Sequence, residues 1–524
     1  MNRALPTLCV VAVAAGFLLG FPNLGLAPFW VDETVAVTPA LSIHEHGLPT
    51  TRFGLDFMPW QLKYELWDPA TPLYRYAVAA FTAVFGFSEW TTRAFSLCLA
   101  LGCAVTLGLL VRRLHDAPTG WMAAALLMTS PTFLVFAREA RHFSFVILLS
   151  LCTLLFLYAS ARGDERARVL WFVSAVALLL SQTLGYLFAP LVALYVLWNG
   201  PRRFVAPKSW PIYAGVAGVY LAVLAVFWET LPFFHVTDCG NREAGCQPDP
   251  LFYPRVLRIF LAPMVERTLY QLSQAWSLQQ LLFLLGAVVV GVEIARGFRA
   301  GDRARASLLL LWLLLPPLLL ASREVKFPRY LLIWSAPVCA LLVAVAIERV
   351  AGLAGRRAPV ARLALLALAL LSPRLLNEGG WSTPRWVLSS GLLDYVDENV
   401  RHPDADNVHR IGWQVATLRS VAQPQDAIVT SLDDATLQYY LERPVHGFLD
   451  SERSDDDFLA LLGEAERTGA VVWFVDSLPV WNHCLSDQPE PRAVDCREKF
   501  ARFYARCSDP PDPETSRCRR LPLH

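Results

Sequence analysis

Long apolar runs recur along this chain from Leu5 to Leu371, and they restrict it to a small set of folds. A helix needs about 17–25 mostly apolar residues to cross a bilayer. Hydrophobic residues make up 55% of the chain and charged residues 17%, below the roughly 25% of soluble domains. The sequence therefore predicts an α-helical polytopic membrane protein, and a net charge of +1 gives no reason to expect nucleic acid as a partner.

Short basic turns separate the apolar runs, and their spacing predicts the topology. Cytoplasmic loops are enriched in Lys and Arg, so turns of this kind must be separated by even numbers of spans. This holds if 72–86 is a surface helix inside one external loop from 28 to 91, with the N-terminus cytoplasmic and the C-terminus external. The turns contain Arg3; Arg112 and Arg113; Arg162, Arg166 and Arg168; Arg202, Arg203 and Lys208; Arg296, Arg299, Arg303 and Arg305; and Arg349, Arg356, Arg357 and Arg362.

About eleven spans follow from this topology. A cleaved signal peptide in place of the first span is the alternative, but no A-x-A-like site precedes the loop and its removal would misorient the next segment. The fifth and sixth spans share a short stretch, so one or both are expected to be short or tilted. The expected spans are about 5–27, 92–112, 118–136, 142–161, 169–183, 185–198, 211–229, 279–295, 306–321, 329–348 and 360–373.

Cysteine positions agree with this arrangement. An even number of cysteines on the external side is typical of disulfides in an oxidising compartment, and the chain contains no N-x-S/T sequon, which favours a bacterial periplasm over an endoplasmic lumen. We therefore expect a multi-pass protein of the bacterial inner (plasma) membrane with its C-terminal domain in the periplasm. Five cysteines fall inside spans, whereas six fall in external segments: Cys239, Cys246, Cys484, Cys496, Cys507 and Cys518.

The composition changes after Arg374, so the sequence divides into residues 1–374, a transmembrane domain, and residues 375–524, an external domain. Strand-like runs at 426–431 and 470–475 alternate with helix-like stretches, which indicates a small α/β domain. It contains no nucleophile or phosphate-loop pattern, and we expect a lid or a domain that docks the acceptor. The tail from Cys484 onward is expected to be irregular and held by disulfides.

Three clusters of charge lie in external segments beside apolar runs, where ionisable groups are costly and usually functional. The first is the acidic pair Asp32 and Glu33, in "FWVDET". The second is "REARH", which begins at Arg138 and includes Arg141. The third is "SREVKFPRY", with Arg323, Lys326, Arg329 and Tyr330.

These clusters contain the groups needed to displace a phosphate from carbon. Arginine binds phosphate with two hydrogen bonds and lysine binds it as a point charge, and Lys63 in the first loop is a further candidate. A carboxylate beside such a site suits general-base activation of an incoming hydroxyl. The alternative is that the charges pair with one another and anchor loops at the level of the lipid headgroups.

The order of four motifs resembles a known family. "FWVDET" is followed by "DPATPLYRY" and "FGFSEWTTRAFS", then by "SPTFLVFAREARHFSF", and then by "FPRYLLIWSAP". This order, over residues 1 to about 350, is similar to the membrane-embedded GT-C glycosyltransferases of the protein O-mannosyltransferase and aminoarabinose-transferase superfamily. The C-terminal domain resembles the small external domain of many bacterial members.

The resemblance implies a role for individual residues. Asp32 matches the catalytic base and Glu33 completes the acidic pair, while Glu139 falls where relatives keep a second external acidic residue. Arg138 is then the neighbouring basic group, and Arg329 with Tyr330 matches the "RY" that reaches the donor phosphate. Relatives place a lysine or histidine directly before the surface helix, whereas this chain has "WDPATP" there, and "QTLGY" at 182–186 lacks the histidine that relatives often show.

The implied reaction is a single inverting displacement that needs no nucleotide. A polyprenyl-phosphate-linked sugar is the donor, and the acceptor is a protein, lipid or glycan hydroxyl that the sequence does not identify. A divalent metal ion stays an alternative, with "HEH" at 44–46 and His235 with Asp238 as short ligand patterns. A lipid-linked-sugar flippase or transporter, or a non-catalytic membrane subunit, is the alternative function, but transporters keep ionisable residues near mid-bilayer and related halves.

Overall fold

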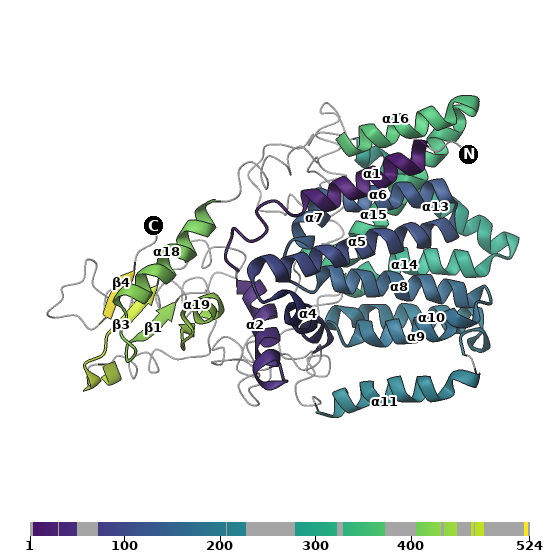
Figure 1. Cartoon of the computed structure of the whole chain (residues 1–524). Coiled ribbons are helices and arrows are strands. Elements are labelled where there is room, and N and C mark those ends of the chain that lie inside the picture. The colour runs from purple at the N-terminus through teal and green to yellow at the C-terminus, as the bar shows by residue number, and fades with distance from the viewer. Residues whose placement is uncertain are drawn as a thin grey trace, which may run out of the picture. The chain divides into compact units, whose positions relative to one another are not determined.

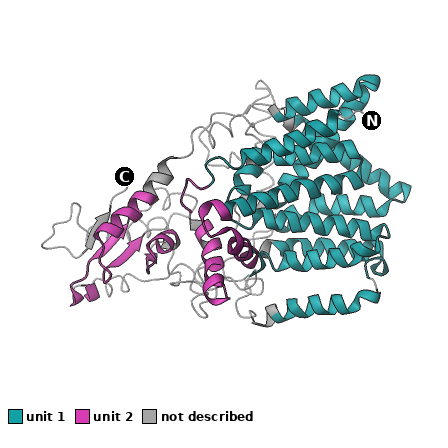
Figure 2. Cartoon of the chain, viewed as in Figure 1, with its two compact units in different colours: residues 1–24, 70–74, 93–403 teal, residues 25–69, 75–92, 404–524 magenta. Residues whose placement is uncertain are grey.

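The computed structural model divides into two compact units, which are coloured separately in Figure 2. Unit 1 comprises residues 1–24, 70–74 and 93–403, and unit 2 comprises residues 25–69, 75–92 and 404–524. Most of the loop that the sequence predicts to be external therefore belongs to the same unit as the C-terminal domain. The structure describes residues 4–29, 31–49, 72–205, 207–226, 278–321, 328–371, 405–430, 434–447, 463–465, 467–475 and 518–521.

Unit 1 is built from apolar helices that Figure 1 shows running roughly side by side. A helix occupies each of the eleven segments that the sequence predicts to span the membrane, although its ends differ in places. The helices are α1 (Ala4–Leu19), α5 (Glu89–Leu114), α6 (Ala117–Met128) with α7 (Pro131–Ala137), α8 (Phe143–Ala161), α9 (Glu165–Leu179), α10 (Phe188–Asn199), α11 (Trp210–Val226), α13 (Leu278–Ala300), α14 (Arg303–Ala321), α15 (Pro328–Leu353) and α16 (Ala358–Leu371).

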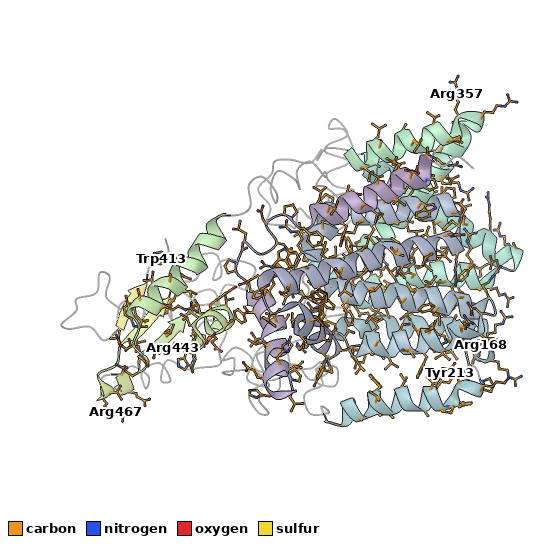
Figure 3. The ribbon with its side chains drawn as sticks, in the orientation of Figure 1. Arg168, Tyr213, Arg357, Trp413, Arg443 and Arg467 are labelled. Atoms are coloured by element: carbon orange, nitrogen blue, oxygen red, sulfur yellow. The ribbon has the colours of Figure 1, made fainter. Side chains whose placement is uncertain are left out.

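Within the described residues, four segments are long and apolar enough to cross a membrane by length and composition: 89–114, 143–161, 281–300 and 332–353. Shorter apolar helices accompany them at 4–19, 117–128 and 185–199. The chain is thus a polytopic membrane protein, as the apolar runs predict. The sides of the membrane stay a prediction, and Figure 3 places Arg168 and Arg357, from two of the predicted cytoplasmic turns, at the same end of these helices.

Local sequence explains where the helices differ from the expected spans. The first expected span, 5–27, is helical only to Leu19, and turns continue to Leu26. The third, 118–136, is two helices, because Ser130 caps α7 by accepting a hydrogen bond from the Phe133 N–H at 3.4 Å and Pro131 follows it. Between the fifth and sixth expected spans, a 3₁₀ helix (Thr183–Leu187) turns the chain from α9 to α10.

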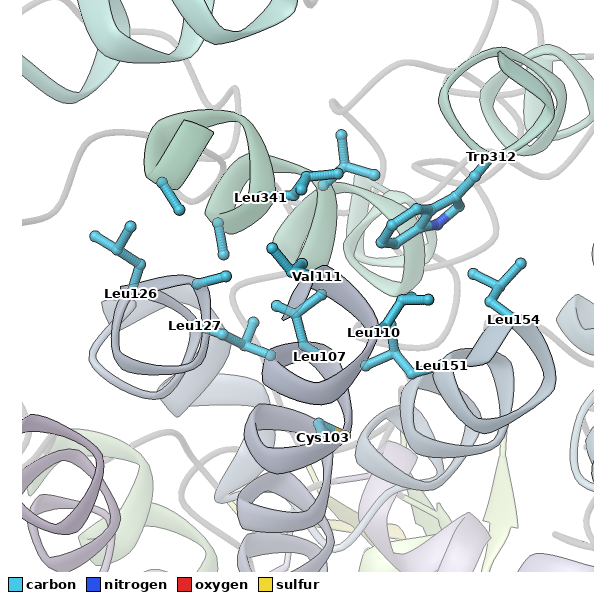
Figure 4. Packing of buried hydrophobic residues seen from close by; sticks show 14 of the residues in the cluster. Cys103, Leu107, Leu110, Val111, Leu126, Leu127, Leu151, Leu154, Trp312 and Leu341 are labelled. Carbon is cyan, nitrogen blue, oxygen red and sulfur yellow. The ribbon is translucent and has the colours of Figure 1, made fainter. Parts of the chain in front are cut away.

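The core of unit 1 is formed by aliphatic and aromatic side chains from facing helices, and Figure 4 shows part of it around Trp312. Leu107 and Val111 of α5 and Leu127 of α6 are fully buried, and Trp312 of α14 is 1% exposed. Small residues permit close helix contacts, as is common in membranes. A Cβ atom at Gly286 of α13 would lie 2.0 Å from the carbonyl oxygen of Leu342 in α15, so the two helices approach as closely as their backbones allow.

A partly buried group of ionisable side chains joins α13, α14, α15 and the end of α5 in unit 1. Glu293 of α13 accepts a hydrogen bond from Arg305 Nη2 of α14 at 2.5 Å and another from Arg349 Nη2 of α15. His115, just after α5, has Nδ1 3.2 Å from Glu293 Oε2 and 3.0 Å from Arg305 Nη2. We call these four residues the Glu293 cluster. It links helices that are far apart in sequence by charged hydrogen bonds, which are stronger than neutral ones.

Unit 2 contains a small parallel sheet with strand order β2-β1-β3-β4. The strands are β1 (Ala427–Thr430), β2 (His446–Gly447), β3 (Val472–Val475) and β4 (Cys518–Leu521), and two helices accompany them, α18 (Ala405–Val421) and α19 (Asp434–Leu441). All four residues of β3 are buried, as is usual for a parallel strand covered on both faces. The predicted α/β domain is confirmed in these residues.

Unit 2 also contains two helices from the predicted first external loop, α2 (Val31–His46) and most of α4 (Pro72–Phe85). The helix expected at 72–86 is confirmed. Helix α2, which continues through Pro39, was not expected from the sequence. The expectation of an irregular tail after Cys484 is wrong for Cys518–Leu521, because these residues pair with β3 as an added parallel strand.

The structure describes six of the eleven cysteines. Cys9, Cys98, Cys103, Cys152 and Cys339 are free and lie in helices of unit 1. Of the six external cysteines only Cys518 falls within the described ranges, so the disulfides stay a prediction. The proposed boundary at residue 374 also lies outside these ranges.

Candidate active site

The acidic pair lies in the first turn of α2, in unit 2. Carboxylates are favoured at this end of a helix because the first N–H groups carry a partial positive charge. Glu33 is only 1% exposed and Thr34 is fully buried. For Asp32 the structure describes the backbone, as part of the helix, and not the side chain. The structure therefore places both carboxylates that the sequence pairs on one helical turn.

The second cluster forms a tight turn between α7 and α8 in unit 1. The Arg141 N–H donates to the carbonyl oxygen of Glu139 at 2.7 Å, and Arg141 Nη1 lies 3.7 Å from Glu139 Oε2. The Arg141 guanidinium carbon also lies 4.6 Å from the centre of the Phe143 ring, a cation–π contact. Arg141 is 6% exposed, so this cation is held in an apolar setting where electrostatic interactions are strong.

Arg138 binds the segment that follows α1. Its Nη2 donates to the carbonyl oxygen of Pro22 at 2.6 Å. A second arginine does the same two residues further along, because Arg93 Nη1 of α5 donates to the carbonyl oxygen of Leu24 at 2.8 Å. These bonds satisfy carbonyl groups in a stretch without helical partners. Arg138 thus has the loop-anchoring contact that was the alternative to phosphate binding.

Tyr74, in the first turn of α4, lies against the same turn in unit 1. Its ring centre is 6.1 Å from that of His142 and 6.0 Å from that of Phe145. The neighbouring Leu73 N–H donates to the carbonyl oxygen of Leu180, at the end of α9, at 3.0 Å. Tyr74 is 3% exposed, so the start of the "PLYRY" helix is packed into unit 1 and borders the arginine turn.

The third cluster is only partly described. Arg329 and Tyr330 lie in the first turn of α15, whose helix begins at Pro328, and α15 packs against both α7 and α8. The helices that flank the Arg138–His142 turn therefore both contact the helix that carries Arg329 and Tyr330. The side chains of these two residues lie outside the described part of the structure. Lys63, Arg323 and Lys326 lie outside it altogether.

The sequence analysis did not identify two buried arginines as candidate functional residues. Arg93 is 6% exposed and Arg75 of α4 is 7% exposed. Both stand inside otherwise apolar helical stretches, "PLYRYAVAAF" and "WTTRAFSLCL". An arginine in such a setting is a signal of function or of a specific buried contact, and the sequence did contain that signal.

The short metal-ligand patterns gain no support from the described residues. Among them, no group of three His, Cys, Asp or Glu side chains could hold a metal ion. His44 Nε2 lies 2.9 Å from the hydroxyl of Thr82, and His46 forms an exposed ion pair with Glu45 at 3.7 Å. His235 and Asp238 lie outside the described ranges.

Comparison with known proteins supports a fold and finds a family model that matches part of the chain. Residues 69–228 match the family model of the dolichyl-phosphate-mannose-protein mannosyltransferases. Among solved structures, the chain is similar to ArnT from Cupriavidus metallidurans bound to undecaprenyl phosphate, with 15% identity, a TM-score of 0.56 and 91% of each chain covered. The apo state of the same protein gives 16% identity and a TM-score of 0.53, with 87% of this chain and 88% of that chain covered. A search of curated protein sequences gave no match.

The matched range 69–228 includes α4, the Arg138–His142 turn and the helices up to α11, which are the segments that carry the middle motifs of the resemblance. The structural likeness extends over nearly the whole chain. The chain is therefore a polytopic membrane protein with the GT-C fold, and it carries over residues 69–228 the sequence pattern of the dolichyl-phosphate-mannose-protein mannosyltransferase family.

Proposed function

We propose that this protein is a membrane glycosyltransferase that moves a sugar from a polyprenyl-phosphate-linked donor to an acceptor hydroxyl at the outer, periplasmic face of a bacterial inner membrane. The observation that carries the proposal is the acidic pair in the first turn of α2, the next helix after the first apolar helix, in a chain of the GT-C fold. The likeness to ArnT, whose structure was solved with undecaprenyl phosphate, supports a polyprenyl phosphate carrier.

The donor phosphate is assigned to the basic side chains of unit 1. Arg141 is buried and lies 3.7 Å from the Glu139 carboxylate, and a guanidinium in such an apolar setting suits two hydrogen bonds to phosphate oxygens. Glu139 then orients Arg141. Arg329 and Tyr330 reach the phosphate from the first turn of α15. Lys63 and Lys326 complete the assignment with Arg138, which also holds the carbonyl oxygen of Pro22.

The reaction is one displacement with inversion at the anomeric carbon. Asp32 takes the proton of the acceptor hydroxyl, and the freed oxygen lone pair forms the new bond to the anomeric carbon. The bond from that carbon to the phosphate oxygen breaks, and polyprenyl phosphate leaves with the electron pair. The arginines and Lys326 stabilise the negative charge that grows on this leaving group. Glu33 is buried and follows Asp32 in the sequence, and it orients the helical turn that carries both residues.

The test is the exchange Asp32→Asn, which keeps size and removes the basic oxygen. Transfer is measured in membranes with their own lipid-linked donors and acceptors, as polyprenyl phosphate released and detected by mass spectrometry. We expect a fall of roughly a hundredfold to ten-thousandfold, with binding of undecaprenyl phosphate retained, and a milder fall for Glu33→Gln.

Three other outcomes would each change the proposal. If Asp32→Asn transferred sugar at the parental rate and Glu139→Gln abolished transfer, the base would be Glu139 and the assignment to Asp32 would be wrong. If neither exchange mattered, the glycosyltransferase proposal would fail. Movement of the lipid-linked sugar across the bilayer without release of polyprenyl phosphate would instead support a flippase.

A further inference from the structure

Helix α19 of the C-terminal domain packs against α2, the helix that carries the acidic pair, and both belong to unit 2 (Figure 1). The hydroxyl oxygens of Thr436 and Thr34 lie 3.4 Å apart, and both residues are fully buried. One turn further along α19, the Tyr439 ring meets the Phe29 ring edge to face, with centres 5.4 Å apart. The contacts thus fall on both sides of the acidic pair in the sequence.

The hydroxyl of Tyr440 connects three segments that are far apart in the chain. It accepts a hydrogen bond from the Phe29 N–H at 2.7 Å and donates one to Glu89 Oε1 at 2.6 Å. Phe29 is fully buried, so its N–H would be costly to leave without an acceptor. We call this chain of two hydrogen bonds the Tyr440 bridge.

The donor and the acceptor in each hydrogen bond of the Tyr440 bridge are fixed. Burial, followed by the hydrogen bond to Glu89, raises the pKa of Tyr440. The hydroxyl therefore keeps its proton at every pH at which a cell works, and that proton goes to Glu89. Its oxygen is then always available to accept from Phe29. The direction follows from the hydrogen-bond geometry, and the raised pKa maintains it.

Glu89 is itself held in place at the first turn of α5. The Ser88 N–H donates to the Thr91 hydroxyl at 2.9 Å, and the Thr91 N–H donates back to the Ser88 hydroxyl at 3.2 Å. This reciprocal arrangement is the one that caps helix N-termini. Gly25 adds a second fixed point, since a Cβ atom there would lie 3.1 Å from Trp90 Cβ. The segment 25–29 is therefore held along the first turn of α5 at both ends.

Phe29 is three residues before Asp32, a distance of at most about 10 Å along an extended chain. Fixing Phe29 therefore limits where the first turn of α2 can lie. A general base works only when it is placed within a fraction of an ångström, and a misplacement of 1 Å can cost about a hundredfold in rate. The Tyr440 bridge acts on the segment that sets this placement.

We propose that Tyr440 is a positioning residue for the acidic pair, so that the C-terminal domain completes the catalytic site instead of serving only as a lid or docking domain. The Phe29 amide and the Glu89 carboxylate are its two partners in this role. The inference rests on the proposed glycosyl transfer only for its effect on rate, because the ordering of the 29–34 segment can be measured without any reaction.

The test uses Tyr440→Phe in the full-length protein, which removes the hydroxyl and keeps the ring. Tyr439→Phe is the matched control, because it keeps the ring that contacts Phe29 and leaves the Tyr440 bridge intact. We expect hydrogen–deuterium exchange at residues 29–34 to rise in Tyr440→Phe and to stay at the parental level in Tyr439→Phe. Transfer should fall roughly tenfold to hundredfold only in Tyr440→Phe, while the dissociation constant for undecaprenyl phosphate stays unchanged.

Glu89 gives an independent pair of variants in case Tyr440→Phe does not fold. Glu89→Gln keeps an oxygen that accepts the tyrosine proton and should retain ordering and transfer, whereas Glu89→Ala should lose both to the extent of Tyr440→Phe. Equal behaviour of the two Glu89 variants, or parental exchange at 29–34 in Tyr440→Phe, would overturn the positioning role. Parental transfer in Tyr440→Phe combined with a large loss in Asp32→Asn would overturn it too, and would leave the proposed function standing.

Discussion

The Glu293 cluster allows the stability of the helical unit to be perturbed without touching the proposed chemistry. Glu293 is 9% exposed, and its carboxylate accepts from Arg305, which is 29% exposed, and from Arg349, which is 58% exposed. A hydrogen bond to a charged group contributes about 1.5–3 kcal/mol. The bond to Arg349 is worth at most about 1 kcal/mol, because that arginine is largely in solvent.

Glu293→Ala removes the acceptor and leaves Arg305 and His115 beside each other without it. Adding the two bonds gives an expected loss of roughly 1.5–4 kcal/mol, whereas Arg349→Ala should cost about 0–1 kcal/mol. The thermal midpoint of the purified protein in detergent, followed by tryptophan fluorescence, should fall by several degrees in Glu293→Ala and hardly move in Arg349→Ala.

The cluster should not matter for transfer. Ser96 marks the end of α5 near the arginine turn, because its hydroxyl donates to the carbonyl oxygen of Arg141 at 3.4 Å. His115 of the Glu293 cluster follows the other end of α5. Nineteen residues of helix at 1.5 Å each separate them by about 28 Å. Well below its midpoint, Glu293→Ala should therefore transfer at the parental rate per folded molecule. A midpoint equal to that of the parent, or a larger loss in Arg349→Ala than in Glu293→Ala, would refute the reasoning.

Three further predictions concern phosphate, topology and pH. Arg329→Ala should weaken use of the lipid-linked donor by about 1.5–3 kcal/mol while the exposed Arg303→Ala does not, as measured by transfer at limiting donor; equal, near-zero effects would favour loop anchoring. Thiols engineered at Pro118, Asp164 and Gly301 should resist an impermeant reagent added outside, whereas thiols at Gln61 and Ser451 should react; labelling of Gly86 only from the cytoplasmic side would contradict the external surface helix. Because the pKa of Tyr440 is raised, its stabilising effect should be complete below pH of about 10 and be lost as the pH rises further. The difference in unfolding free energy between the parent and Tyr440→Phe, measured against pH, should therefore shrink only in strongly alkaline solution, and a decline near neutral pH would argue against the bridge.

The sequence by itself determined the membrane class, the positions of most of the apolar helices that the structure describes in unit 1, and the α/β character of the described part of the C-terminal domain. These properties depend on local features, namely apolar run length, helix caps and the alternation of strand-like and helix-like segments, which can be read over a few tens of residues. It also showed a resemblance to a family, because "FWVDET", "PLYRY", "REARH" and "FPRY" follow one another along the chain in the order seen in that family. The ends of the helices were less predictable, as the break at Ser130 and the early end of α1 at Leu19 show.

Only the tertiary structure decided which distant residues meet. Tyr440 and Glu89 are 351 positions apart, and Phe29 and Tyr440 are 411 apart, yet single hydrogen bonds join them. The same holds for the Glu293 cluster and for Arg93, whose partner is a backbone carbonyl at Leu24 that no side-chain pattern marks. Such contacts depend on how whole helices pack and on the cost of burying an unsatisfied polar group. Neither the packing nor the burial can be read from the local sequence.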